Sequence, residues 1–244
     1  MIRRRFFSLT IIAASCWLMV SMGVAADLPE PLQKQIEISV TKYAESLKEA
    51  DDRLLKAFDA ELALVRKQGN LKAEERLLLI EKISADKAIY EKKGLLPLSS
   101  RMRPASVSYI KSVQEAKSPL STAYDKAIDH LSKAKDDAGA TAKLNEKRKL
   151  LEPKIASRWN CAGVTWKGNM TYVLYSDGTA RIETEPEIAT WTIGKDVVVI
   201  RKPDARAPGG AWIETCQIDA SGLTMLATNQ RGGKWRGTRI DGAK

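Results

Sequence analysis

The hydrophobic pattern divides the chain into two parts with different periods. From Leu32 to about Ile155, apolar residues recur every three or four positions among many Ala, Lys and Glu residues, which is typical of amphipathic helices. After Trp159 the period becomes two, with frequent turn dipeptides, which is typical of antiparallel strands. The sequence therefore predicts an α+β protein in separate modules, with a helical part over residues 27–157 and a β domain over residues 158–244.

The helical part contains an internal repeat at an offset of 66 residues. The twenty-residue segments that begin at Tyr43 and Tyr109 share seven identical residues, so two copies of one unit are the simplest explanation. The apolar stripe advances by about 3.67 residues per step, which favours straight or slightly right-handed packing. Pro119 interrupts the second stripe, so we expect a kink or a new helix start there.

Turn signals indicate that each copy is an antiparallel pair of helices. Residues 66–70 and 136–141 combine glycine with polar residues at the end of each stripe, where a helix is expected to stop and the next to begin. We predict two coiled-coil-like helical hairpins, over about residues 32–93 and 105–155, joined by residues 94–104. The apolar stripes also leave self-association between chains open.

The β domain reads as a series of hairpins. The first turns at Asp177 and Gly178, a dipeptide that favours two-residue hairpin loops. Two further hairpins follow, and flanking strands at residues 161–166 and 234–240 bring the total to about eight in sequential order. This order predicts an antiparallel β meander or a small barrel.

The N-terminus has the features of an export signal. Three arginines beginning at Arg3 precede a long apolar run, and small residues follow, which predicts a signal peptide over residues 1–26 with cleavage after Ala25 or Ala26. The protein would then be periplasmic or extracellular, with no membrane span in the remaining chain. Retention of the segment as an anchor, or lipidation of Cys16, are the alternatives.

Two cysteines remain after signal removal, Cys161 and Cys216. In an exported chain such a pair predicts a disulfide, which would stabilise the β domain by about 4 kcal/mol. The alternative is a pair of buried free thiols.

The positive charge is spread along the chain. The formal net charge is +10, with 26 Lys and Arg against 21 Asp and Glu over residues 27–158, and 11 against 9 over residues 159–244. Such diffuse charge suits an anionic envelope surface or polymer, and it argues against specific nucleic-acid binding.

No catalytic, metal or cofactor motif is present. The only histidine is His130, and a zinc site needs several ligands. Glu183, Glu185 and Glu187 alternate beside Pro186, so they lie on one face that could bind a cation weakly or in a solvated loop. We therefore predict a protein that is not an enzyme, with no catalytic residues, no metal and no cofactor.

The β domain concentrates the aromatic residues. A small domain must bury most of its tryptophan rings, and we predict a core that contains Trp166, Trp191, Trp212 and Trp235.

The stretch GGKWRGTR, residues 232–239, is the most basic aromatic cluster. Period two places Trp235 on the opposite face from its neighbouring cations, while Arg231 in the preceding turn could lie over the ring. The predicted candidate binding edge consists of Arg231, Lys234, Arg236 and Arg239.

The order of motifs in the predicted β domain resembles that of a known kind of domain. An Asp-Gly-Thr hairpin at residues 177–179, the strand of Trp191, and a closing strand that contains Trp-Arg-Gly-Thr-Arg resemble small lipocalin-like β domains. With the export signal and charged helical repeats, the chain is similar to exported bacterial proteins of unknown role that share this plan. Gly163 and Trp166 are one residue further apart than in true lipocalins, so the resemblance implies architecture rather than a ligand.

Together these features predict an exported non-enzymatic binding or scaffold protein of the cell envelope. The helical repeats would act as a spacer or assembly surface, and the β domain would bind an envelope protein or polymer. The alternatives are a β domain that binds a small ligand or carbohydrate, and a hydrolase with an unrecognised site.

Overall fold

The computed structural model describes residues 28–165, 167–194 and 197–240. Within them, four α-helices precede eight β-strands, so the predicted α+β organisation in separate modules is confirmed. The helices are α1 (Glu30–Lys67), α2 (Ala73–Lys93), α3 (Arg103–Lys133) and α4 (Asp137–Leu150). The strands are β1 (Ile155–Gly163), β2 (Asn169–Tyr175), β3 (Thr179–Ile182), β4 (Ala189–Ile193), β5 (Val197–Pro203), β6 (Ala211–Ile218), β7 (Thr224–Asn229) and β8 (Lys234–Arg239). The predicted signal peptide, with Cys16, Ala25 and Ala26, lies outside the described residues.

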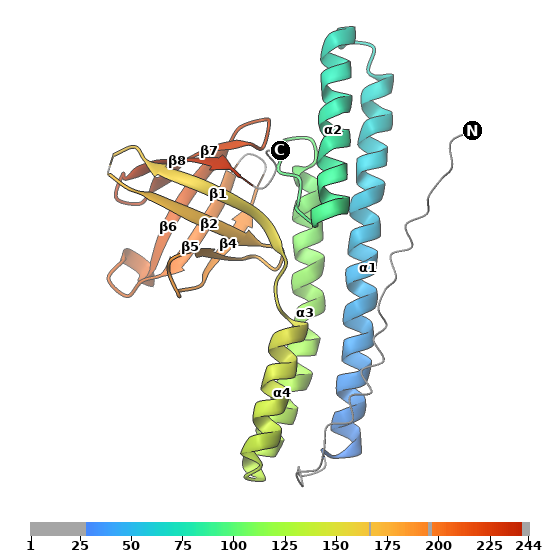
Figure 1. The fold of residues 1–244 in the computed structure, drawn as a ribbon, viewed down its shortest axis with the longest axis vertical. Helices are drawn as coiled ribbons and strands as arrows, with labels where there is room; N and C mark the ends of the chain where they lie inside the picture. Colours follow the sequence, from blue (N-terminus) through green and yellow to red (C-terminus); the bar gives the residue numbers. More distant parts are fainter. Residues whose placement is uncertain (1–27, 166, 195–196, 241–244) are drawn as a thin grey trace, which may run out of the picture.

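The apolar stripes of the long helices are covered within the chain. Helix α1 runs beside α2 and then α3, and α4 packs against α3 (Figure 1). Leu54 and Phe58 of the first stripe are buried, as are Leu120 and Tyr124 at the matching positions of the second. Helix α3 continues through Pro119 without a break, so no new helix begins there. The coiled-coil geometry and the repeat remain predictions.

The eight strands form a closed barrel in which each strand pairs with its neighbour in sequence. Strand β1 also pairs with β8, with Cys161 opposite Gly237, which closes the wall. Alternate residues point inward, and Trp159, Trp191 and Trp235 are each at most 1% exposed. These rings fill much of the interior, so the predicted antiparallel barrel has a packed core over most of its length.

One end of the barrel is closed by the segment between α2 and α3. The Leu96 N–H donates to the Ala156 carbonyl at 3.0 Å, and the Ser100 N–H donates to the Ala220 carbonyl at 3.2 Å. Leu96 and Leu98 are almost fully buried at this contact. The sequence indicated only a connection between hairpins here, whereas the segment joins the helical part to the barrel (Figure 1).

The predicted disulfide is not formed. Cys161 and Cys216, the two cysteines that the structure describes, are both buried free thiols. They lie on β1 and β6, and β7 and β8 separate these strands in the barrel wall. Their side chains therefore enter the interior from separate parts of the wall, not from paired positions. Burial raises the pKa of the Cys161 thiol to about 12, which keeps it protonated and unreactive at neutral pH.

Candidate functional site

The end of the barrel remote from the helices contains a pocket. The loops between β1 and β2, β3 and β4, β5 and β6, and β7 and β8 all lie at this end, because the strands alternate in direction. The pocket has a volume of about 610 Å³. Its lining is mainly charged and aromatic, and consists of Met170, Tyr172, Ile182, Glu185, Glu187, Lys202, Pro203, Asp204, Ala205, Arg206, Trp212, Glu214 and Arg231.

Glu214 lies at the inner part of this pocket. It belongs to the inward-facing register of β6, two residues before Cys216, and is only 5% exposed. The Tyr172 hydroxyl donates to its Oε2 at 2.7 Å, and the Trp212 indole N–H donates to its Oε1 at 3.2 Å. Burial raises the pKa of the Glu214 carboxyl group, although these hydrogen bonds act in the opposite direction. A buried carboxyl group is thus held in one orientation by two neutral donors.

Two further aromatic contacts surround this carboxyl group. Tyr172 stacks on Trp235, with ring centroids 5.3 Å apart and an interplanar angle of 23°. The Trp235 indole N–H also lowers the pKa of Glu214, without forming a hydrogen bond of ordinary geometry. The carboxyl group therefore lies among three aromatic side chains that come from β2, β6 and β8.

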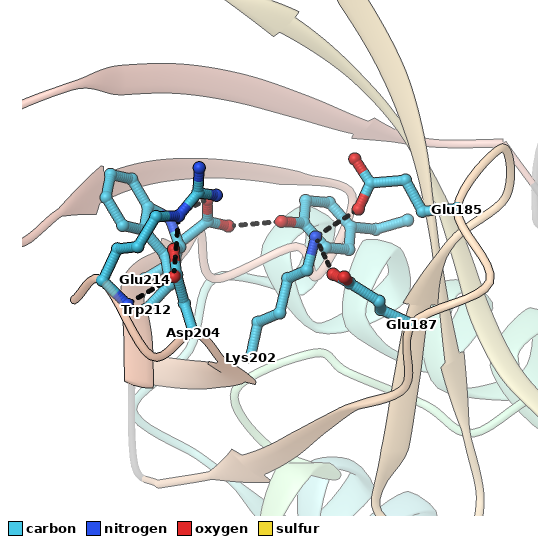
Figure 2. Close-up of polar contacts among 8 residues, drawn as sticks. Glu185, Glu187, Lys202, Asp204, Trp212 and Glu214 are labelled. Atoms are coloured by element: carbon cyan, nitrogen blue, oxygen red, sulfur yellow. Dashed lines mark hydrogen bonds and ion pairs between the residues drawn. The ribbon is translucent and has the colours of Figure 1, made fainter. Parts of the chain in front are cut away.

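A lysine and two glutamates span the pocket entrance (Figure 2). Lys202 continues the inward register of β5 after Val198 and Ile200. Its Nζ lies 2.7 Å from Glu187 Oε2 and also contacts Glu185, and both glutamates belong to the loop between β3 and β4. Although burial alone would lower the pKa of Lys202, these two carboxylates raise it. The sequence suggested that this glutamate cluster could bind a cation, and the structure places the chain's own ammonium group there.

The other charged groups of the pocket also have partners. Asp204 pairs with Arg206, with 3.4 Å between Oδ1 and Nε. The Arg231 guanidinium lies over the ring of Trp212, with its Cζ 5.3 Å from the centroid. The sequence suggested a position over Trp235 for this arginine, so the cation does stack on a tryptophan, but on a different strand.

The candidate binding edge does not come together. Lys234 and Arg236 are exposed and point away from the barrel interior, on the opposite face from Trp235. Arg239 is 7% exposed at the other end of the barrel, where its charge acts on Asp86 of α2. Only Arg231 reaches the pocket.

The predicted core aromatics separate into two groups. Trp191 and Trp235 are buried in the barrel, whereas Trp212 is partly exposed and lines the pocket. Trp166 lies outside the described residues.

Sequence reasoning missed Glu214 and Lys202. Both occupy positions that period two assigns to the interior, at Trp212-Glu214-Cys216 and at Val198-Ile200-Lys202. A charged residue in an inward-facing register was the available signal, because such residues are rarely buried without a partner or a function.

The described residues give less support to a metal site, a membrane span or a site between the helices. Within the part of the chain that the structure describes, no group of three or more His, Cys, Asp and Glu residues is arranged to hold a metal ion. None of the described helices is long and apolar enough to cross a membrane. A groove of about 810 Å³ lies between α1 and α3. Its Glu49 and Arg53 side chains are more than half exposed, and its Tyr43, whose pKa is raised by burial, is only half-buried.

Comparisons with known proteins identify no relative. The chain matches no protein-family model, no curated protein and no solved structure. Function must therefore be inferred from the pocket itself.

Proposed function

We propose that this chain is an exported, non-enzymatic binding protein whose barrel holds a small hydroxylated ligand, such as a carbohydrate, in the pocket at its open end. The observation that carries this proposal is the buried Glu214 carboxyl group, held by Tyr172 and Trp212 at the inner part of the pocket. A carboxyl group in this position is costly for the fold, since an apolar side chain would pack without desolvating a charge. Groups of this kind concentrate at functional sites.

The composition of the pocket supports a hydroxylated ligand. Carboxylates accept hydrogen bonds from hydroxyl groups, while Lys202 and Arg231 donate to hydroxyl and ring oxygens. Trp212 adds an aromatic surface. The numbers of acidic and basic residues in the lining are nearly equal, four against three, which disfavours a strongly charged ligand.

The helical part serves as a support in this proposal. It closes one end of the barrel through residues 94–102, and so leaves the opposite end free for ligand. The lipocalin-like resemblance concerns the barrel architecture alone, and the interior beneath the pocket is filled by aromatic rings. An envelope polymer rich in sugars would present such ligands.

A role in assembly is the second candidate function. The stripes are covered within the chain, but Leu64 of α1 and Leu77 and Leu78 of α2 are 51%, 66% and 60% exposed. Exposed leucines of this kind can mediate contact between chains. Light scattering on the purified protein tests this role, and a monomer at high concentration would remove it.

Calorimetric titration with a panel of hexoses tests ligand binding. The panel consists of D-glucose, D-galactose, D-mannose, N-acetyl-D-glucosamine and D-glucosamine. We expect saturable binding of at least one sugar, and weaker binding by the Lys202→Met variant, because this change removes a donor from the pocket. Arg201→Met is the matched control, since Arg201 is the preceding residue of β5 and faces solvent. The proposal fails if no sugar binds, or if the two variants weaken binding equally.

A further inference from the structure

The charge pairing in the pocket leaves one acidic group unmatched. Lys202 contacts Glu185 and Glu187, and Asp204 pairs with Arg206. Glu214 differs, since within residues 28–165, 167–194 and 197–240 it accepts hydrogen bonds from neutral donors and forms no ion pair. Lys202 acts on it only through its charge at longer range.

The surroundings of Glu214 suit a positive charge. The Tyr172 hydroxyl and the Trp212 indole N–H hold a buried carboxylate that forms no ion pair with the described residues, and both side chains line the pocket beside it. An unpaired carboxylate of this kind favours an ammonium group over a neutral one. Trp212 already carries the Arg231 guanidinium over its ring, which indicates that cations are accommodated here. An anionic group would instead meet Glu214 without any cation bound to it.

The remaining pocket wall suits hydroxyl groups. The cluster of Lys202, Glu185 and Glu187 offers donors and acceptors whose charges already balance each other in part. A ligand that carried several charges would have to separate these ion pairs. Hydroxyl groups can instead form hydrogen bonds with the remaining protons of Lys202 and the remaining lone pairs of Glu185 and Glu187.

We propose that the ligand is a hydroxylated amine, such as an amino sugar, whose single ammonium group pairs with the Glu214 carboxylate while its hydroxyl groups contact the entrance cluster. This inference rests on the proposed function, because it assigns one chemical class to the same pocket. Glu214 is then the residue that determines specificity. The ligand supplies the counter-charge that the folded chain does not place beside this carboxylate.

Isothermal titration with three related sugars tests the inference. D-glucosamine carries an ammonium group, D-glucose carries a hydroxyl group at the same position, and N-acetyl-D-glucosamine carries a neutral amide. A charged hydrogen bond in place of a neutral one predicts that D-glucosamine binds about tenfold more tightly than the other two. Equal affinities for the three sugars would overturn the inference and leave the proposed function standing. Absence of any binding would overturn both.

Variants assign the preference to Glu214. Glu214→Gln removes the negative charge with little change in shape. The variant should therefore bind D-glucosamine about as tightly as it binds the other two sugars. Glu183→Gln is the matched control, because Glu183 pairs with Arg158 and does not line the pocket. A preference that survives Glu214→Gln would overturn the assignment. The comparison of sugars on the unaltered protein decides the amine class even if this variant does not fold.

Discussion

Among single residues, Glu214 is expected to control how the stability of the barrel depends on pH. Burial raises the pKa of its carboxyl group above the ordinary value of 4.5. The folded chain therefore binds this proton more tightly than the unfolded chain does. The free energy of unfolding must then fall as pH rises through the interval above the unfolded pKa, where the folded protein retains a proton that the unfolded chain has lost.

Glu214→Gln should remove this dependence. We expect the free energy of unfolding of the variant, relative to that of the unaltered protein, to increase as the pH rises above 4.5, the ordinary pKa of the carboxyl group. Urea denaturation at several pH values, with tryptophan fluorescence as the signal, measures the difference. Glu183 is exposed, so Glu183→Gln should leave the pH dependence of the free energy of unfolding unchanged. A difference between Glu214→Gln and the unaltered protein that stays constant with pH would contradict a raised pKa at Glu214.

For single residues, the sequence predicted the direction in which a side chain points better than the residues that it contacts. Strand alternation predicted that Trp235 faces away from Lys234 and Arg236, and it also assigns Lys202 and Glu214 to the interior. It did not indicate that Lys202 meets glutamates fifteen and seventeen residues earlier, since that contact depends on how a loop folds over the barrel mouth. The disulfide prediction failed for a similar reason, because cysteine count and compartment contain no information about which strands become neighbours.

At the scale of elements, α3 holds the barrel through a buried acidic turn. Asp177, in the turn between β2 and β3, accepts the Lys117 ammonium group at 2.5 Å, and its side chain is 3% exposed. Gln114 of the same helix donates to the Asp177 carbonyl at 3.0 Å. Thus one face of the helix provides both the charge and the amide that this turn needs.

Lys117→Met should destabilise the protein by about 2 kcal/mol. The substitution leaves the Asp177 carboxylate buried without its counter-charge, and this kind of loss costs more than the removal of a surface pair. Lys111→Met on the same helix is the matched control. Lys111 lies 3.8 Å from Glu115 in an exposed pair, so its removal should cost less than about 0.5 kcal/mol. Equal effects in urea denaturation would show that the Lys117 contact contributes no more than a surface pair.

The helices and strands were the most predictable elements. Their periods of three to four and of two follow directly from which faces must be buried. The segment at residues 94–102 was harder, because it has neither period. Its Leu95, Leu96 and Leu98 were a signal of burial, but apolar residues in a connection do not indicate which surface will cover them.

At the scale of the whole molecule, the helical part and the barrel are joined by close contact between backbones. Gly222, in the turn between β6 and β7, has a φ of 73° and lies against Leu98 and Ser99. A Cβ atom there would lie 2.6 Å from the Leu98 carbonyl carbon and from the Ser99 nitrogen. The barrel therefore approaches the helical part to a distance that only glycine permits.

We call the contact between residues 94–102 and the turn between β6 and β7 the joint. Gly222→Ala should weaken this joint more than it weakens the turn itself. Gly232 is the matched control, because its turn has a φ of 80° and the same type of N–H to carbonyl contact, at 3.0 Å against 3.1 Å for Gly222. A Cβ atom at Gly232 meets nothing within 4 Å. Both alanine variants carry the strain of a positive φ, about 1 kcal/mol, but only Gly222→Ala adds the clash.

Hydrogen exchange separates the two effects. The N–H groups of Leu96 and Ser100 donate across the joint to Ala156 and Ala220, so their exchange should accelerate in Gly222→Ala, since the barrel must move away from residues 94–102 to admit the new methyl group. In Gly232→Ala these amides should exchange as in the unaltered protein, even though the barrel loses stability. If the exchange rates of these two amides changed equally in both variants, opening of the joint would depend on the stability of the barrel and not on the close approach at Gly222. The contrast therefore identifies the contacts that fix the barrel to the helical part at the end opposite the pocket.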